Sequence, residues 1–110
     1  MAKEGDRVLA ISHADADVLY VFGQGVYMGD MSPKDFSKEN QPVGQLAEIM
    51  MEVPEYTNPC IKLDDGKIIW GCECWWGPLD DNGIQRELEA FTETRKVDIH
   101  EQRSKYRSEE

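Results

Sequence analysis

The chain has 110 residues, of which 40% are hydrophobic and 31% charged, and its formal net charge at pH 7 is −10. This length fits a single domain over residues 1–110, and the composition excludes a membrane-embedded or a disordered chain. Asp and Glu number 22 against 12 Lys and Arg, so the surface should repel phosphate backbones and no direct nucleic-acid partner is expected.

The first two predicted strands form a hairpin. Residues 7–12 and 18–22 are rich in β-formers, and the aspartates between them suit a turn. The second strand continues to residue 30 through Gly23, Gly25 and Gly29, which indicate a bulge, a sharp bend or a close backbone approach. We therefore expect a strongly bent strand.

A polar loop and a helix follow. Residues 31–41 have no sustained period and predict a surface loop with one helical turn begun by Ser32 and Pro33. After Pro42, apolar residues recur at helical spacing and predict a helix that stops before Pro54. The recurring apolar residues of this predicted helix are Val43, Leu46, Met50 and Val53.

The clearest local signal is a second hairpin over residues 60–74. Asp65-Gly66 lies between two β-rich runs and favours a two-residue turn, because glycine accepts positive φ. In this register Cys60 and Glu73 share the outer face. The inner face carries Ile61, Leu63, Ile68, Trp70, Cys72 and Cys74. We therefore expect both thiols of the Cys-Glu-Cys stretch to be buried and reduced.

The C-terminal third predicts a helix, a strand and a tail. Apolar residues at helical spacing over residues 84–95 follow the possible capping residues Asp80, Asp81 and Asn82. Residues 96–101 then alternate in polarity as a closing strand does. Residues 103–110 are expected to form a short helix or a frayed tail. The helix stripe consists of Ile84, Leu88, Phe91 and Arg95.

These elements predict an α+β fold with a small, strongly bent antiparallel sheet and two helices. An SH3-like barrel with helical insertions is the first form we expect. The alternative is an open five-stranded sheet with both helices on one face.

The stretches GQGVYMGD, NPCIKLDDGKIIWGCECWWGP and KVDIHEQRSKYR together cover most of the chain. In these stretches the sequence resembles small proteins encoded by phages and mobile elements, including integron cassettes. The resemblance implies a bacterial protein and transfers no activity. The cytoplasm is also the expected compartment from the sequence itself, because no signal-peptide-like or membrane-spanning apolar run occurs and three cysteines leave one without a bridge.

The sequence predicts no catalytic, metal or cofactor site. A zinc site would need Cys72 and Cys74 to recruit Cys60 and either His13 or His100, but a single Cys-x-Cys pair does not have the usual spacing of zinc ligands. No nucleophile motif, phosphate loop or His-Glu-x-x-His occurs either. We therefore expect a protein that is not an enzyme.

Aromatic residues remain as the best candidates for a binding site. All three tryptophans lie within residues 70–76, next to acidic residues. The predicted binding surface consists of Tyr20, Tyr27, Trp75, Trp76, Glu73 and Asp30. The leading hypothesis is a cytoplasmic module that docks on a protein partner or forms a homodimer through this surface.

Two alternatives belong to other classes. The first is an acidic mimic of nucleic acid that inhibits a host protein, which the excess of acids motivates. The second is a protein that binds a small cationic ligand under the bend at residues 23–29. In that site Tyr27 and Trp76 would form the walls, and Asp30 or Glu73 would bind the basic group.

Overall fold

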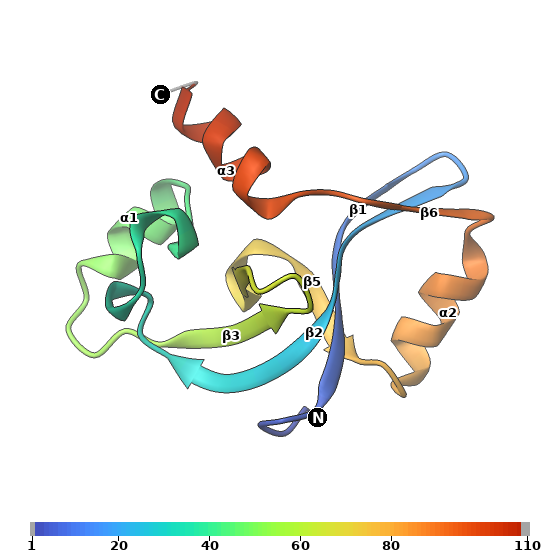
Figure 1. Cartoon of the computed structure of the whole chain (residues 1–110), viewed down its shortest axis with the longest axis horizontal. Coiled ribbons are helices and arrows are strands. Elements are labelled where there is room, and N and C mark those ends of the chain that lie inside the picture. Colours follow the sequence, from blue (N-terminus) through green and yellow to red (C-terminus); the bar gives the residue numbers. More distant parts are fainter. Residues whose placement is uncertain (1, 109–110) are drawn as a thin grey trace.

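The computed structural model describes residues 2–108, whose six strands form one sheet (Figure 1). Neighbouring strands follow the order β4-β3-β2-β1-β5 and are antiparallel, while β6 pairs with β2 in parallel. The predicted α+β class is therefore confirmed. The strands are β1 (Arg7–Asp15), β2 (Val18–Met31), β3 (Asn58–Leu63), β4 (Ile68–Trp70), β5 (Trp75–Pro78) and β6 (Glu93–Lys96).

Helices and 3-10 turns connect the strands of the described chain. Among residues 2–108, no helix is long and apolar enough to cross a membrane. The α-helices are α1 (Gln45–Met51), α2 (Asn82–Ala90) and α3 (Ile99–Ser108), and the 3-10 turns are η1 (Pro33–Asp35), η2 (Lys38–Asn40) and η3 (Gly71–Glu73).

The predicted hairpin of β1 and β2 is confirmed, and β2 is strongly bent (Figure 1). At Gly23 the backbone φ is 127°, a region that side chains disfavour. At Gly25 a Cβ atom would lie 2.4 Å from the backbone carbonyl oxygen of Lys62 on β3. Glycine therefore allows both the bend of β2 and the close approach of β3.

The bent sheet is open. On one edge, β2 pairs with β6 through residues 18–21 and with β3 through residues 25–31, while β1 covers its other edge. The terminal strands of the order, β4 and β5, are not paired with each other in the described part of the chain. The sheet is therefore open, as in the alternative prediction, but it has six strands instead of five in the described chain, and it does not close into an SH3-like barrel.

The sheet buries apolar side chains on both faces. On β1, Val8 and Ala10 pack in a core that includes Ile99 of α3. The alternating residue Leu9 packs in a second core that includes Ile84 of α2. Because successive strand residues point to opposite faces, α2 and α3 cover opposite faces of the sheet. The two predicted helices correspond to α1 and α2, and no described residue of α1 belongs to either core, so the expectation that both cover one face of the sheet is wrong.

The predicted register of the β3–β4 hairpin is wrong by one residue. Cys60 pairs with Trp70, so the loop comprises the three residues 64–66, with Gly66 at a φ of 91°. The Asp65 carboxylate accepts a hydrogen bond of 2.9 Å from the backbone N–H two residues later, which stabilises this longer loop. Cys60 and Trp70 consequently share a face instead of lying on opposite ones.

In the C-terminal third, the start of α2 agrees with the prediction, whereas the end of α2 and the positions of the later elements differ from it. Asp81 caps α2 by accepting hydrogen bonds from two backbone N–H groups, but the helix ends at Ala90. The last strand is β6, earlier than the predicted residues 96–101, because Asp98 accepts backbone hydrogen bonds that start α3. Residues 103–108 are thus helical and not a frayed tail, and residues 109–110 lie outside the described residues.

Candidate functional site

Three residues of the predicted aromatic surface do come together. The rings of Tyr27 on β2 and Trp76 on β5 have centroids 5.1 Å apart, and both pack against the core that contains Ile99. The Tyr27 hydroxyl donates a hydrogen bond of 2.9 Å to the Asp30 carboxylate. Partial burial and the Asp30 carboxylate both raise the pKa of Tyr27. Tyr27, Trp76 and Asp30 therefore form one acidic and aromatic cluster, as the sequence predicted for these three residues.

Tyr20 and Trp75 lie apart from that cluster. Tyr20 is stacked on His13 with ring centroids 4.5 Å apart, near the β1–β2 turn. Trp75 neighbours Trp76 on β5 but is 54% exposed, and both line a cavity of about 240 Å³ beside α2. The structure therefore divides the predicted aromatic surface into separate parts.

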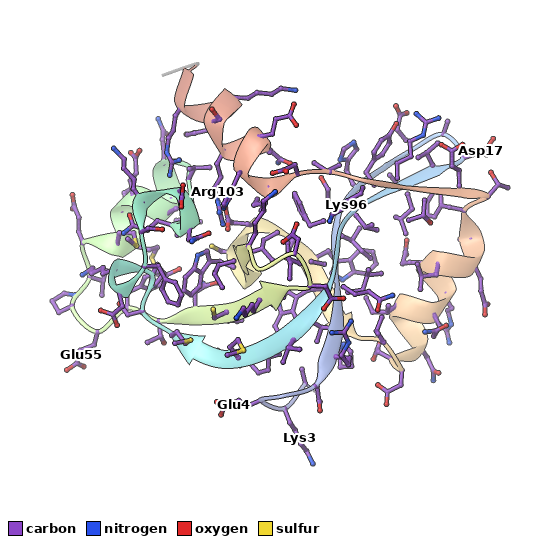
Figure 2. All side chains as sticks on the ribbon, viewed as in Figure 1. Lys3, Glu4, Asp17, Glu55, Lys96 and Arg103 are labelled. Carbon is purple, nitrogen blue, oxygen red and sulfur yellow. The ribbon has the colours of Figure 1, made fainter. Side chains whose placement is uncertain are left out.

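Glu73 is buried in an ion pair and does not lie on the predicted aromatic surface, so this part of the prediction is wrong. Its side chain is only 7% exposed and forms an ion pair with Arg103, which is 1% exposed. The guanidinium donates to both carboxylate oxygens, from Nε at 2.9 Å and from Nη2 at 2.5 Å. Figure 2 shows Arg103 between α3 and the body of the molecule. The pair anchors α3 and has a structural role.

The cysteines also differ from the prediction. The strand that should have buried them ends at Trp70 and is followed by η3, so Cys72 is exposed and Cys74 half-buried. Only Cys60 is fully buried, and all three thiols are free. Burial raises the pKa of the Cys60 thiol to about 11. Desolvation of the sulfur atoms and the negative charge of Glu73 also raise the pKa values of the exposed Cys72 and the half-buried Cys74. Such thiols are weak nucleophiles at neutral pH.

Among residues 2–108, no group of three or more His, Cys, Asp and Glu side chains is arranged to hold a metal ion. His100 is bonded to the Asn40 side chain at 3.0 Å, and His13 to the Ser12 hydroxyl at 2.8 Å.

An exposed apolar face on α1 is a feature that the sequence analysis did not identify as a site. Helix α1 starts only after Gly44, whose φ is 117°, and Ala47 is its one buried residue. Leu46 is 71% exposed, Ile49 is 62% exposed, and Val53 in the following turn is 44% exposed. Together with the half-buried Met50, these residues have the spacing of one helix face and form what we call the apolar stripe.

The apolar stripe borders a groove between α1 and α3. The groove has a volume of about 630 Å³ and reaches Cys72 of η3. Its walls are mostly apolar and aromatic, which is typical of sites that bind ligands or partner side chains. They include Val43, Leu46, Ala47 and Met50 near α1, Tyr56 before β3, and Tyr106 of α3. We call the groove and the apolar stripe together the α1 surface.

One signal for this surface was present in the sequence. Residues 43–53 contain more apolar side chains than one narrow helix face can hold. Ile49 and Met51 are apolar in addition to the four residues predicted to line that face. Such a wide apolar arc indicates a second buried face or an interaction surface. The pattern alone does not distinguish these two outcomes.

Comparisons with protein-family models, with curated proteins and with solved structures give no match. The resemblance to proteins of phages and mobile elements therefore stays a prediction, and the functional argument depends on the geometry of this chain.

Proposed function

We propose that this protein is a non-enzymatic binding module that docks on a protein partner through the α1 surface. The observation that supports this most directly is the exposure of Leu46 and Ile49, at 71% and 62%, on a helix that buries only Ala47. Monomeric proteins rarely expose contiguous apolar side chains of this size unless the patch has a binding role.

Burial of the α1 surface would be energetically favourable. Full burial of an exposed leucine or isoleucine side chain contributes about 1.5–3 kcal/mol. Leu46 and Met50 border the groove, whereas Ile49 and Val53 lie beside it. A partner could therefore cover the apolar stripe and insert a side chain into the groove at the same time, an arrangement that concentrates binding energy in a few residues.

The α1 surface is a better docking surface than the aromatic surface expected from the sequence. Tyr27 and Trp76 already pack against the core, and Glu73 is engaged by Arg103. Of the predicted tryptophans, Trp75 alone is classed as exposed among the described residues. A single exposed indole offers less contiguous apolar area than the stripe on α1.

Ser12 and His13 are paired but do not complete a catalytic triad within the described part of the chain. Ser12 and His13 form a nucleophile-like pair, with 2.8 Å between the hydroxyl oxygen and Nδ1. Within residues 2–108, no carboxylate is bonded to the His13 ring, which is stacked on Tyr20 instead. The third group that normally orients such a base is therefore not in place.

Site-specific photocrosslinking tests the proposed function. A benzoylphenylalanine at position 46 should form protein adducts in a lysate of the source cells. The matched control carries the probe at the exposed position of Arg86 on α2. Adducts should form from position 46, disappear when Ile49→Glu and Val53→Glu are added, and be absent from position 86. Equal adducts from both positions, or none from position 46, would contradict docking through the α1 surface.

A second candidate function is binding of a small cationic ligand at Tyr27, Trp76 and Asp30. The ring pair at 5.1 Å next to a carboxylate favours it, because a cation is attracted by both aromatic faces and negative charge. Tetramethylammonium and arginine methyl ester should then quench or shift tryptophan fluorescence with saturation. The response should be lost in Trp76→Leu and kept in Trp75→Leu, and a non-saturating response would remove this candidate.

Mimicry of nucleic acid remains a third, charge-based prediction. Several carboxylates form ion pairs with basic residues of the same chain, such as Asp64 with Arg7 and Asp98 with Lys67. A mimic would need rows of free carboxylates at phosphate spacing. Competition with duplex DNA for a nuclease of the source cells would test it, and unchanged nuclease activity would contradict it.

A further inference from the structure

A cavity of about 370 Å³ lies between α3, η3 and the segment before α1. Its lining includes the ion pair of Glu73 and Arg103, whose side chains are 7% and 1% exposed. Lys105 of α3 also lines the cavity, and the apolar part of the wall is formed by Val43, Ile99 and Tyr106. We infer that this cavity binds a small organic acid that has a single carboxylate and an apolar body.

Arg103 has one N–H donor left for a ligand. Of the five N–H donors of a guanidinium, two bind the Glu73 carboxylate, and two others donate to the backbone carbonyls of Glu39 and Ile68. No hydrogen bond within residues 2–108 uses the second N–H of Nη1. A ligand oxygen that accepts from this N–H is favoured, because a buried donor without a partner costs free energy.

Lys105 supplies a second cation to the cavity. It is exposed and forms no ion pair within the described residues. By contrast, Lys96, which lines another cavity together with Lys105, is paired with Asp65. Hydrogen bonds between a charged donor and a carboxylate are stronger than those between neutral groups. Lys105 and the remaining N–H of Arg103 therefore favour a ligand that carries a carboxylate.

The charges in the lining favour a ligand with one negative charge. Arg103 and Lys105 are positive and Glu73 is negative, so the lining has an excess of one positive charge. One carboxylate neutralises this excess. The second charge of a phosphate dianion would instead be repelled by the Glu73 carboxylate.

The rest of the lining fits an apolar body. Ile99 is buried, and Val43 and Tyr106 are half-buried, so apolar groups lie beside the charged ones. Ligand sites usually have volumes of about 300–1,000 Å³ and combine apolar walls with a few polar groups that fix the orientation of the ligand. A cavity of about 370 Å³ is at the small end of this range. The expected apolar body is therefore a single ring or a short aliphatic chain.

NMR titration of the full ¹⁵N-labelled chain with benzoate and with hexanoate tests this inference. At least one of the two acids should shift the backbone amide signals of α3 with saturation. The corresponding amides, which have the same apolar bodies without the charge, should bind at least about tenfold more weakly. Amides that bind as tightly as the acids, or acids that produce no saturable shift, would overturn the inference.

Lys105→Gln measures the contribution of the exposed cation. The spectrum of the free variant checks that the chain is folded, and its affinity for the acid should fall at least about tenfold. The matched control is Lys62→Gln on β3, where an exposed lysine lies outside the cavity lining. It removes the same charge from the chain and should keep the wild-type affinity. Equal losses in both variants would indicate a general charge effect and contradict the site.

The side-chain signal of Arg103 reports whether the acid enters the cavity. Its Nε–H donates to Glu73 at 2.9 Å and belongs to a buried guanidinium. This signal should shift over the same range of acid concentration as the α3 amides, whereas the signal of the exposed Arg7 should not. Binding that depends on Lys105 but leaves the Arg103 signal unchanged would place the acid on the surface and overturn binding in the cavity.

This site is separate from the α1 surface, although Val43 and Tyr106 line both the cavity and the groove. Lys105 lines the cavity but not the groove, so adducts from a probe at position 46 should persist in Lys105→Gln. Absence of acid binding with retained adducts would remove only this inference. Loss of the adducts with retained acid binding would remove only the proposed docking function.

Discussion

The ion pair of Arg103 and Glu73 is the most constrained side-chain contact of the described chain. Besides both carboxylate oxygens, Arg103 donates hydrogen bonds to the backbone carbonyls of Glu39 at 2.8 Å and Ile68 at 2.9 Å. Glu73 in turn accepts from the Trp70 backbone N–H at 3.1 Å. Each buried charge is therefore compensated by partners from distant segments, which is the condition for such a pair to be tolerated.

Arg103→Met should destabilise the protein by about 3–5 kcal/mol, because it leaves the Glu73 carboxylate buried without its cation. Urea denaturation at neutral pH measures this. The control Arg95→Met removes an exposed ion pair with Glu93 and should change the free energy of unfolding by less than about 0.5 kcal/mol. Similar small losses for both variants would contradict the structural role of the buried pair.

The three thiols should react in an order set by burial. Cys72 is exposed, Cys74 half-buried and Cys60 buried, so iodoacetamide should label Cys72 first in the folded protein. Partial desolvation of its sulfur atom and the charge of Glu73 raise the pKa of Cys72, so less of this thiol is ionised at a given pH. The labelling rate of Cys72 should therefore still increase above pH 9. Mass spectrometry of peptides after timed quenching reports the order. Faster labelling of Cys60 would be inconsistent with the fold.

At the scale of elements, α3 depends on Asp98. This carboxylate accepts from the backbone N–H groups of His100 at 2.9 Å and Glu101 at 3.2 Å, and pairs with Lys67 at 2.5 Å. The hydrogen bond with Lys67 and the two backbone N–H groups hold the pKa of Asp98 below its ordinary value. The cap therefore links the first turn of α3 to the β3–β4 loop.

Asp98→Asn should cost about 1 kcal/mol at pH 7, through the weaker cap and the lost ion pair. Since the pKa of Asp98 is lowered on folding, its stabilising contribution is present above the pKa of the unfolded chain, near 4, and is lost as pH falls through the lower folded value. The stability difference between the two proteins should therefore shrink at acidic pH. Urea titrations at pH 7 and near pH 3 measure it, and a difference independent of pH would contradict the linkage.

At the scale of the whole molecule, the two cores are closed by different helices. Ile84 of α2 completes one core and Ile99 of α3 completes the other. Because α3 also carries Arg103, the second face of the sheet depends on the C-terminal segment for both an apolar and a charged contact. The fold is therefore expected to be cooperative along the chain.

A chain that ends at Lys96 should lose cooperative unfolding at 25 °C. It would expose the core around Ile99 and leave Glu73 without Arg103, and these losses together approach the total stability of a small domain, about 5–15 kcal/mol. Thermal unfolding followed by circular dichroism tests this. Adding Glu73→Leu to the truncated chain should recover part of the stability, and full cooperativity in the simple truncation would contradict the role of α3.

The sequence by itself determined the features that depend on neighbouring residues. The β-rich runs of the first hairpin, the bend at Gly23 and the cap of Asp81 on α2 all follow from local backbone preferences, and each was predicted. The acidic and aromatic cluster around Tyr27 and Trp76 was also anticipated in part.

Only the tertiary structure decided the features that depend on distant partners. The buried state of Glu73 requires Arg103, thirty residues later in the chain. The register after Asp65 and the exposed state of Cys72 follow from a three-residue loop and a 3-10 turn that the alternating pattern also permits. Likewise, the stripe on α1 has the same spacing whether it is buried or exposed. Periodicity reports local geometry, whereas desolvation of a side chain depends on which segments fold against it.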